Sequence, residues 1–175
     1  MYACTLHFGQ IRKGNGSPYI THPLAVAALV AEFGGDEDQV IAALLHDVLE
    51  DCDVGVESVQ ARYGAEVAEM VLSCSDTTVR PKPPWRPRKE AYLRSLAAVP
   101  PRAKLVIAAD KLHNLQCILH DLERPSVGET IWSRFRAPKA EQFWYFNAVV
   151  AALADGWDSE LLEELRRVAS RVTSS

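Results

Sequence analysis

Residues 41–51 place four ionisable side chains at the end of an otherwise apolar segment. His46 and Asp47 interrupt the apolar run, and Glu50 and Asp51 follow about one helical turn later. On a helix, Glu50 lies over both His46 and Asp47, because residues three and four apart share a face. Burying such groups is costly unless they are hydrogen-bonded or bind a metal. The stretch is a first indication of a metal site.

Two further positions supply the same residue types. Asp110 interrupts an apolar helix, and His22 lies directly before Pro23. Taken singly, His22 is typical of a helix cap, and Asp110 of a structural salt-bridged carboxylate. Together with His46 and Asp47 they offer two imidazoles and two carboxylates that can converge in the core of a helical bundle. A His/Asp set without thiolates suits Mn²⁺, Fe²⁺, Co²⁺ or Zn²⁺.

The acidic pair Glu50 and Asp51 has two interpretations. A divalent metal lowers the pKa of a bound water and so supplies a nucleophile near neutral pH. Carboxylates one turn beyond the ligands can orient that water or transfer its proton. The alternative is a solvated acidic helix end, but the C-terminus of a helix disfavours carboxylates. The position of the pair at a helix end therefore asks for a reason, and a role in proton transfer would supply one.

A basic and polar group accompanies these acids. Arg12 and Lys13 precede a glycine-containing loop, and Asn114 follows Asp110 by one turn. Arginine can stack on a base, lysine can pair with phosphate, and asparagine can read a nucleobase edge. For Arg12 and Lys13 the simpler alternative is a solvated helix end, which basic residues favour.

The elements that must position these residues are predicted to be helical. No segment shows the period-2 alternation of a strand, and no glycine-rich phosphate-binding motif occurs. Pro23 suits a first helical position with His22 as the cap, and Asp36 is expected to cap the helix that carries His46. The proline-rich residues 77–87 form either a loop near the site or a tether without function. Helices are expected at 2–13, 23–33, 37–51, 56–63, 65–74, 88–96, 102–122, 139–154 and 159–172.

Length and composition fit one all-α domain over residues 1–175, a bundle of about eight to ten helices. The net charge of −4 gives no basic field for duplex nucleic acid. The four cysteines form no CxxC pair, which argues against a zinc ribbon or a disulfide scaffold. No signal pattern or membrane-length apolar run is present, so we expect a cytoplasmic protein without a membrane partner. The oligomeric state is left open.

Three blocks, at residues 12–23, 45–51 and 109–114, resemble the HD-domain hydrolases of the RelA/SpoT type. The resemblance is strongest to the small, stand-alone members, including the metazoan SpoT homologue. It runs from about residue 7 to the penultimate helix. Because three ordered blocks match in spacing, the signal is far more specific than an HD dipeptide.

The resemblance implies a Mn²⁺-dependent hydrolase that removes pyrophosphate from the 3′ position of guanosine tetra- or pentaphosphate through a metal-activated water. Another divalent transition metal remains an alternative to Mn²⁺. Glu50 and Asp51 would be the catalytic acids. The resemblance further implies metal ligands at His22, His46, Asp47 and Asp110, substrate contacts at Arg12, Lys13, Asn114 and Tyr145, and a phosphate end at Arg88 and Lys89.

Two positions depart from the family pattern. Cys52 replaces the threonine that commonly follows the acidic pair, and Gln116 replaces an arginine; either change can alter pyrophosphate handling or the substrate. The alternatives are therefore the same chemistry on another nucleotide, such as the 2′-phosphate of NADPH or a nucleoside monophosphate. A non-catalytic module that binds an alarmone, or a helical adaptor, would be a different class of protein.

Overall fold

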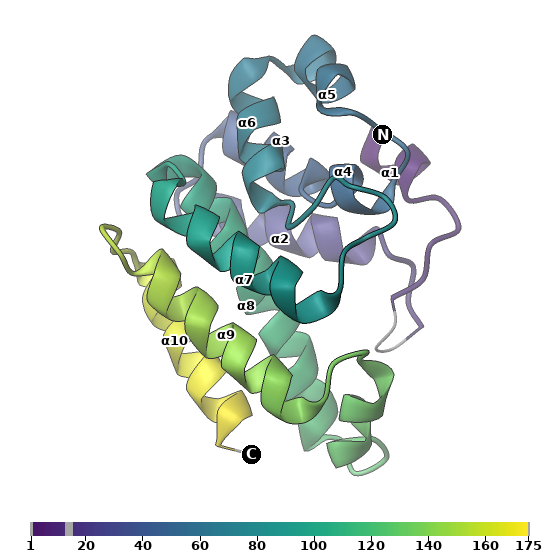
Figure 1. The fold of residues 1–175 in the computed structure, drawn as a ribbon, viewed down its shortest axis with the longest axis vertical. Helices are drawn as coiled ribbons and strands as arrows, with labels where there is room; N and C mark the ends of the chain where they lie inside the picture. Colours follow the sequence, from purple (N-terminus) through teal and green to yellow (C-terminus); the bar gives the residue numbers. More distant parts are fainter. Residues whose placement is uncertain (1, 13–15, 175) are drawn as a thin grey trace.

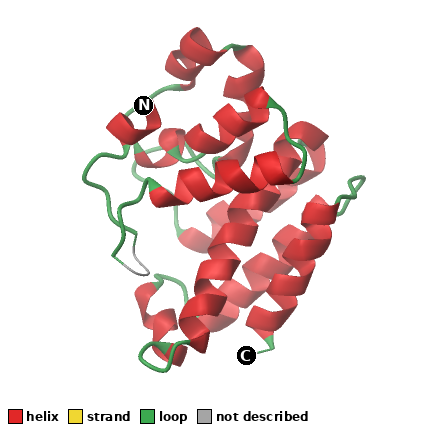
Figure 2. Ribbon diagram, turned by 180° about the vertical axis from the view of Figure 1, so that it is seen from behind, coloured by secondary structure: helices red, strands yellow, loops and turns green. Residues whose placement is uncertain are grey.

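A computed structural model describes residues 2–12 and 16–174. Within these ranges the chain forms helices and no strand, apart from one isolated bridge between Ile11 and Pro18 (Figure 2). The all-α prediction is confirmed. The described elements are α1 (Tyr2–Leu6), α2 (Thr21–Glu32), α3 (Glu37–Leu45), α4 (Val48–Asp51), α5 (Val56–Tyr63), α6 (Ala65–Cys74), α7 (Trp85–Ser95), the 3₁₀ helix η1 (Leu96–Ala98), α8 (Pro101–Glu123), the 3₁₀ helix η2 (Gly128–Arg134), α9 (Lys139–Leu153) and α10 (Glu160–Thr173).

The long helix α8 connects the two parts of the fold (Figure 1). Helices α2, α3 and α6 pack against its first half, η2 packs against its second half, and α10 runs alongside it from near Lys104 to Glu123. Every residue from 103 to 110 is buried, so the first half of α8 is enclosed on all sides. A helix that is apolar all round belongs in a core. Asp110 therefore lies at the end of this buried run, where α8 meets the cleft described below.

The two N-terminal helices differ from the prediction. Helix α1 ends at Leu6, well before residue 13. Helix α2 begins at Thr21, with Ile20 before it, so the prediction that His22 caps a helix starting at Pro23 is wrong. Pro23 is still tolerated, because the first-turn N–H groups have no partner within the helix. The earlier start places His22 in the first turn, with its ring buried.

The segment that carries the HD pair is not one continuous helix. Asp36 caps α3 as predicted. Its carboxylate accepts from the backbone N–H of Gln39 at 3.0 Å, and the Gln39 side-chain oxygen accepts from the backbone N–H of Asp36 at 3.0 Å. The chain then turns at His46 and Asp47 before α4. The His46 ring lies 2.8 Å from the Ala43 carbonyl, which in a continuous helix would accept the N–H of residue 47.

Between α6 and α7 lies a segment without regular structure, residues 75–84, which we call the strap. Helix α7 begins at Trp85, three residues earlier than predicted, which shortens the proline-rich loop. The strap passes close to α4, as the contacts below show. None of the described helices combines the length and apolarity that membrane crossing requires.

Candidate metal centre and cleft

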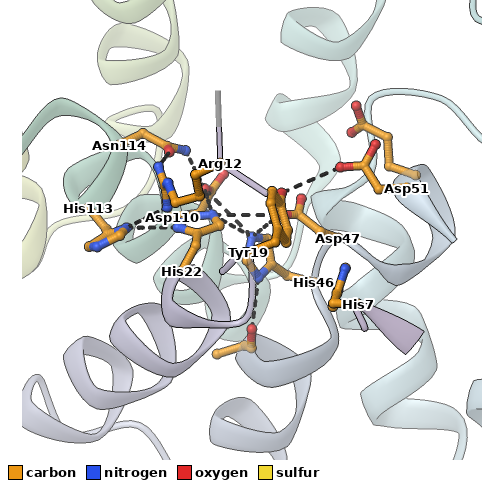
Figure 3. Close-up of polar contacts among 12 residues, drawn as sticks. His7, Arg12, Tyr19, His22, His46, Asp47, Asp51, Asp110, His113 and Asn114 are labelled. Carbon is orange, nitrogen blue, oxygen red and sulfur yellow. Dashed lines mark hydrogen bonds and ion pairs between the residues drawn. The ribbon is translucent and has the colours of Figure 1, made fainter. Parts of the chain in front are cut away.

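The four predicted metal ligands meet in one cluster (Figure 3). His22 comes from α2, Asp110 from α8, and His46 and Asp47 from the turn between α3 and α4. The two imidazole Nε2 atoms lie 3.1 Å apart. Asp110 Oδ1 lies 3.0 Å from Nε2 of His22 and 3.6 Å from Nε2 of His46. Asp47 Oδ2 lies 3.5 Å from Nε2 of His22 and 2.9 Å from Nε2 of His46.

These separations fit the first coordination shell of one ion. Ligand atoms about 2.1 Å from a common metal lie about 3.0–3.4 Å from their neighbours in octahedral or tetrahedral geometry. The donors of His22, His46 and Asp47 lie within 4.8 Å of one another, which is compact enough to hold a metal. Asp110 is not part of that three-residue set and joins the cluster through its contacts with the two imidazoles. Burial alone would lower the pKa of His46, but Asp47 and Asp110 raise it well above its usual value. The two carboxylates therefore favour a positive charge at the imidazole, which either a proton or a metal ion can supply.

A hydrogen bond to the backbone turns the Nε2 atom of His46 towards the cluster. Nδ1 lies 2.8 Å from the Ala43 carbonyl oxygen, which can only accept, so Nδ1 carries the proton. Nε2 is then the nitrogen that faces the cluster, and a bound metal would replace the proton that the raised pKa keeps on it in the metal-free protein. Ligating histidines commonly bind a carbonyl through the other ring nitrogen, because this fixes both tautomer and ring orientation.

His113 has the corresponding role for His22. The Nδ1 atoms of the two rings lie 2.7 Å apart, and Arg12 donates to the same His113 Nδ1 at 3.4 Å. Since a guanidinium can only donate, His113 Nδ1 is the acceptor and His22 Nδ1 the donor. Burial, together with the charges of His22 and Arg12, lowers the pKa of His113 to about 4. His113 is thus a neutral acceptor, and His22 Nε2 is free to bind a metal.

The Asp110 carboxylate is held on both oxygens. Lys111 donates to Oδ2 at 2.6 Å, and Asn114 donates to Oδ1 at 2.6 Å. Asn114 in turn accepts from Arg12 at 3.0 Å. The same guanidinium therefore reaches the partners of two ligands, Asp110 and His22, which links the predicted nucleoside contacts to the cluster.

Tyr19 is a site residue that the sequence analysis missed. Its hydroxyl donates to Asp47 Oδ2 at 2.5 Å and lies 3.4 Å from Asp51 Oδ2. Burial, with the nearby Asp47 carboxylate, raises the pKa of Tyr19, so the hydroxyl keeps its proton and donates it. The only sequence signal was its place between Pro18 and His22, inside the first block.

The acidic pair lies at the edge of the cluster and contacts the strap. Lys82 Nζ lies 2.9 Å from Glu50 Oε1 and 2.9 Å from Asp51 Oδ1. Burial and the carboxylates of Asp76 and Asp47 raise the pKa of Glu50, although Lys82 opposes the shift. Of the two interpretations left open for the proline-rich loop, the position near the site is the one observed.

A cleft of about 960 Å³ extends from this cluster along α8. One end is lined by the acidic pair, Arg12, Asn114 and three of the cluster residues, His22, Asp47 and Asp110, while Arg124 and Arg136 line the other. Several buried apolar residues line the part between them, among them Ile118, Ile131 and Phe146. The volume falls in the range of small-molecule sites, about 300–1,000 Å³.

The remaining predicted contacts are spread over the cleft. Tyr145 of α9 lines it with a buried hydroxyl that has no hydrogen-bond partner among the described residues, and Lys89 lies 4.5 Å above its ring. Arg88 also lines the cleft. Lys13 lies outside the described residues.

The two departures from the family pattern differ in place. Gln116 lines the cleft. Cys52 is buried away from the cleft lining, where its Sγ lies 3.4 Å from the Leu6 carbonyl oxygen and 3.6 Å from His7 Nδ1. It therefore packs α4 against the N-terminal segment.

Comparison with known proteins places this arrangement in a family. The family model described as "HD domain" matches residues 1–139. A guanosine-3′,5′-bis(diphosphate) 3′-pyrophosphohydrolase, MESH1 of Mus musculus, is 35% identical over 170 residues, which cover 95% of this chain and 88% of that protein. A longer pyrophosphohydrolase of the same name from Vibrio cholerae is 42% identical over 150 residues, 81% of this chain and 20% of the other.

Solved structures share the fold. A metazoan orthologue of SpoT that hydrolyses ppGpp superposes with a TM-score of 0.78 at 29% identity, over 95% of this chain and 89% of that one. A protein from Listeria monocytogenes EGD-e superposes with a TM-score of 0.79 at 28% identity, over 88% of this chain and 99% of that one. The chain therefore belongs to the HD domain family and is similar over nearly its whole length to 3′-pyrophosphohydrolases within it.

Proposed function

We propose that this protein is a divalent-metal-dependent phosphohydrolase that removes pyrophosphate from the 3′ position of guanosine 3′,5′-bis(diphosphate). The observation that carries the proposal is the convergence of four donor atoms, 2.9–3.6 Å apart in the measured pairs, at one end of a nucleotide-sized cleft. Relatives that are similar over nearly the whole chain carry this activity in their names.

His22, His46, Asp47 and Asp110 hold the metal, for which we propose Mn²⁺. Bound there, it supplies Lewis acidity and lowers the pKa of a coordinated water. Glu50 or Asp51 accepts the proton from the attacking water. The new bond joins the water oxygen to the 3′-linked phosphorus, and the bond from that phosphorus to O3′ breaks, so that O3′ leaves as a hydroxyl after it gains a proton.

Arg12 and Asn114 hold the nucleoside beside the cluster. Arg12, from the N-terminal segment, donates to Asn114 at 3.0 Å, and Asn114 lies one turn along α8 from Asp110. A guanidinium plane can stack on a base, and an amide can read a base edge. Lys13 and Tyr145 complete the proposed substrate contacts. We place the activity in the cytoplasm.

A nucleotide panel tests the choice of substrate. Purified protein is incubated with Mn²⁺ and guanosine tetraphosphate, NADPH or nucleoside monophosphates, and the products are identified by mass. We expect guanosine diphosphate and pyrophosphate from the first. Release of inorganic phosphate from NADPH or a monophosphate alone would favour the same chemistry on another nucleotide. Tight binding of guanosine tetraphosphate without any product would instead favour a binding module.

A further inference from the structure

The strap is fixed to α4 and α7 at several points. Arg80 donates to the Cys52 carbonyl oxygen at 2.7 Å and to the Glu50 carbonyl oxygen at 3.4 Å. At one end of the strap, buried Asp76 accepts from Arg88 and Lys89. At the other end, Trp85, the first residue of α7, packs its indole against Tyr145, with ring centroids 5.9 Å apart. The strap residues between these anchors are therefore held close to the acidic pair.

Because the strap is anchored in this way, Lys82 contacts both carboxylates of the acidic pair. Its ammonium bridges the two carboxylates of the pair, at 2.9 Å from each. The Lys82 side chain is 33% exposed, and those of Glu50 and Asp51 are 20% and 35% exposed, so the bridge is partly shielded from water. Arg88 lies farther away, 3.9 Å from the Glu50 carboxylate, and Arg80 contacts backbone carbonyl oxygens rather than the two carboxylates.

The Lys82 bridge holds the two carboxylates of the acidic pair on the same side of α4. Consecutive residues on a helix point about 100° apart, and neighbouring carboxylates repel each other. One ammonium bonded to both brings them to the same side of α4. Because Lys82 takes Oδ1 of Asp51, Oδ2 remains turned towards the Tyr19 hydroxyl, 3.4 Å away, and through Tyr19 towards Asp47.

We propose that Lys82 is a positioning residue that holds Glu50 and Asp51 together in the orientation used for proton transfer. The inference deepens the proposed function and rests on it. It assigns a role to the proline-rich strap: the strap delivers one lysine to the acidic pair. Lys82 acts through these two carboxylates rather than by contact with the nucleotide.

Kinetics of Lys82→Met test the proposal, with Lys82→Arg as the conservative variant. The matched control is Arg94→Met, which removes an exposed cation of α7 outside the cleft lining. With guanosine tetraphosphate and bis(p-nitrophenyl) phosphate we expect kcat of Lys82→Met to fall about 100-fold, the scale of a misplaced catalytic group. KM and metal content should stay as in the wild type, and Lys82→Arg should recover part of kcat.

Other patterns overturn the proposal. A raised KM with unchanged kcat would mean that Lys82 binds substrate, and a raised kcat would make the bridge an inhibitory latch. If the wild type hydrolyses bis(p-nitrophenyl) phosphate but not guanosine tetraphosphate, the proposed substrate is refuted. The role of Lys82 is then tested by the kcat of Lys82→Met on bis(p-nitrophenyl) phosphate alone. If the wild type hydrolyses neither compound, a crystal structure of Lys82→Met decides. The proposal requires the Asp51 carboxylate to move away from the Tyr19 hydroxyl in this variant. Glu50 and Asp51 carboxylates in the same positions as in the wild type would refute it.

Discussion

Asp76 is the anchor whose loss gives the clearest measurable effect on stability. Its carboxylate is 3% exposed, and it accepts from Arg88 and from Lys89, which are 12% and 15% exposed. Removing one partner of a buried ion pair costs about 3–5 kcal/mol. The two cations keep some access to water and Asn still offers an oxygen, so we expect Asp76→Asn to lower the free energy of unfolding by about 2–3 kcal/mol. In a chain of this size that corresponds to about 4–12 °C in Tm.

The same contact predicts a pH dependence. Burial alone would raise the pKa of Asp76, but Lys89 and Arg88 more than offset this and lower it below its usual value. A carboxylate with a lowered pKa stabilises the fold above its unfolded pKa of about 3.9, and this stabilisation is lost as the pH falls through the folded pKa. The stability gap between wild type and Asp76→Asn should stay constant from about pH 5 to 8 and narrow below about pH 4.

Urea unfolding followed by circular dichroism between pH 3 and pH 8 measures both effects. Asp53→Asn is the matched control, because it removes an exposed carboxylate and should change the free energy of unfolding by less than about 0.5 kcal/mol. Equal stability of Asp76→Asn and wild type at pH 7 would refute the reasoning. A gap that widens as the pH falls would refute it as well.

Two further substitutions separate the functions of the cluster from those of the cleft. Arg12→Ala removes the proposed stacking partner, so KM for guanosine tetraphosphate should rise about tenfold while metal content, measured by plasma mass spectrometry, stays the same. Tyr19→Phe removes the hydrogen bond to Asp47, so urea unfolding of the metal-free protein should show a loss of about 1–2 kcal/mol. A lower metal content in Arg12→Ala, or an unchanged stability in Tyr19→Phe, would contradict these assignments.

The sequence predicted those features that depend on residue type and local spacing. The cap at Asp36 follows from a residue pattern within four positions. The apolar run before Asp110 required burial, and the structure encloses this part of α8 on all sides. The convergence of His22 with His46 was an inference from chemistry, since a shared ion accounts for several polar groups beside apolar helix faces.

What the sequence did not reveal depends on contacts between distant segments. Tyr19 and Asp47 are 28 positions apart, and His22 and His113 are 91 apart. Local spacing carries no information on such pairs. The break after α3 was missed for another reason: periodicity treats His46 as a helical residue, whereas its ring bonds a backbone carbonyl of the preceding turn. That bond both ends α3 and sets the tautomer of a proposed ligand.

The link between the four-residue cluster and turnover is tested most directly by one comparison. Metal content and Mn²⁺-dependent hydrolysis of guanosine tetraphosphate are measured on the same preparations of wild type, His46→Ala and the control Glu69→Ala, which removes an exposed acid of α6 outside the cleft lining. We predict about one metal ion per chain and full turnover in the wild type and the control, and loss of both in His46→Ala. Full activity or full metal content in His46→Ala would contradict the assignment of the metal site.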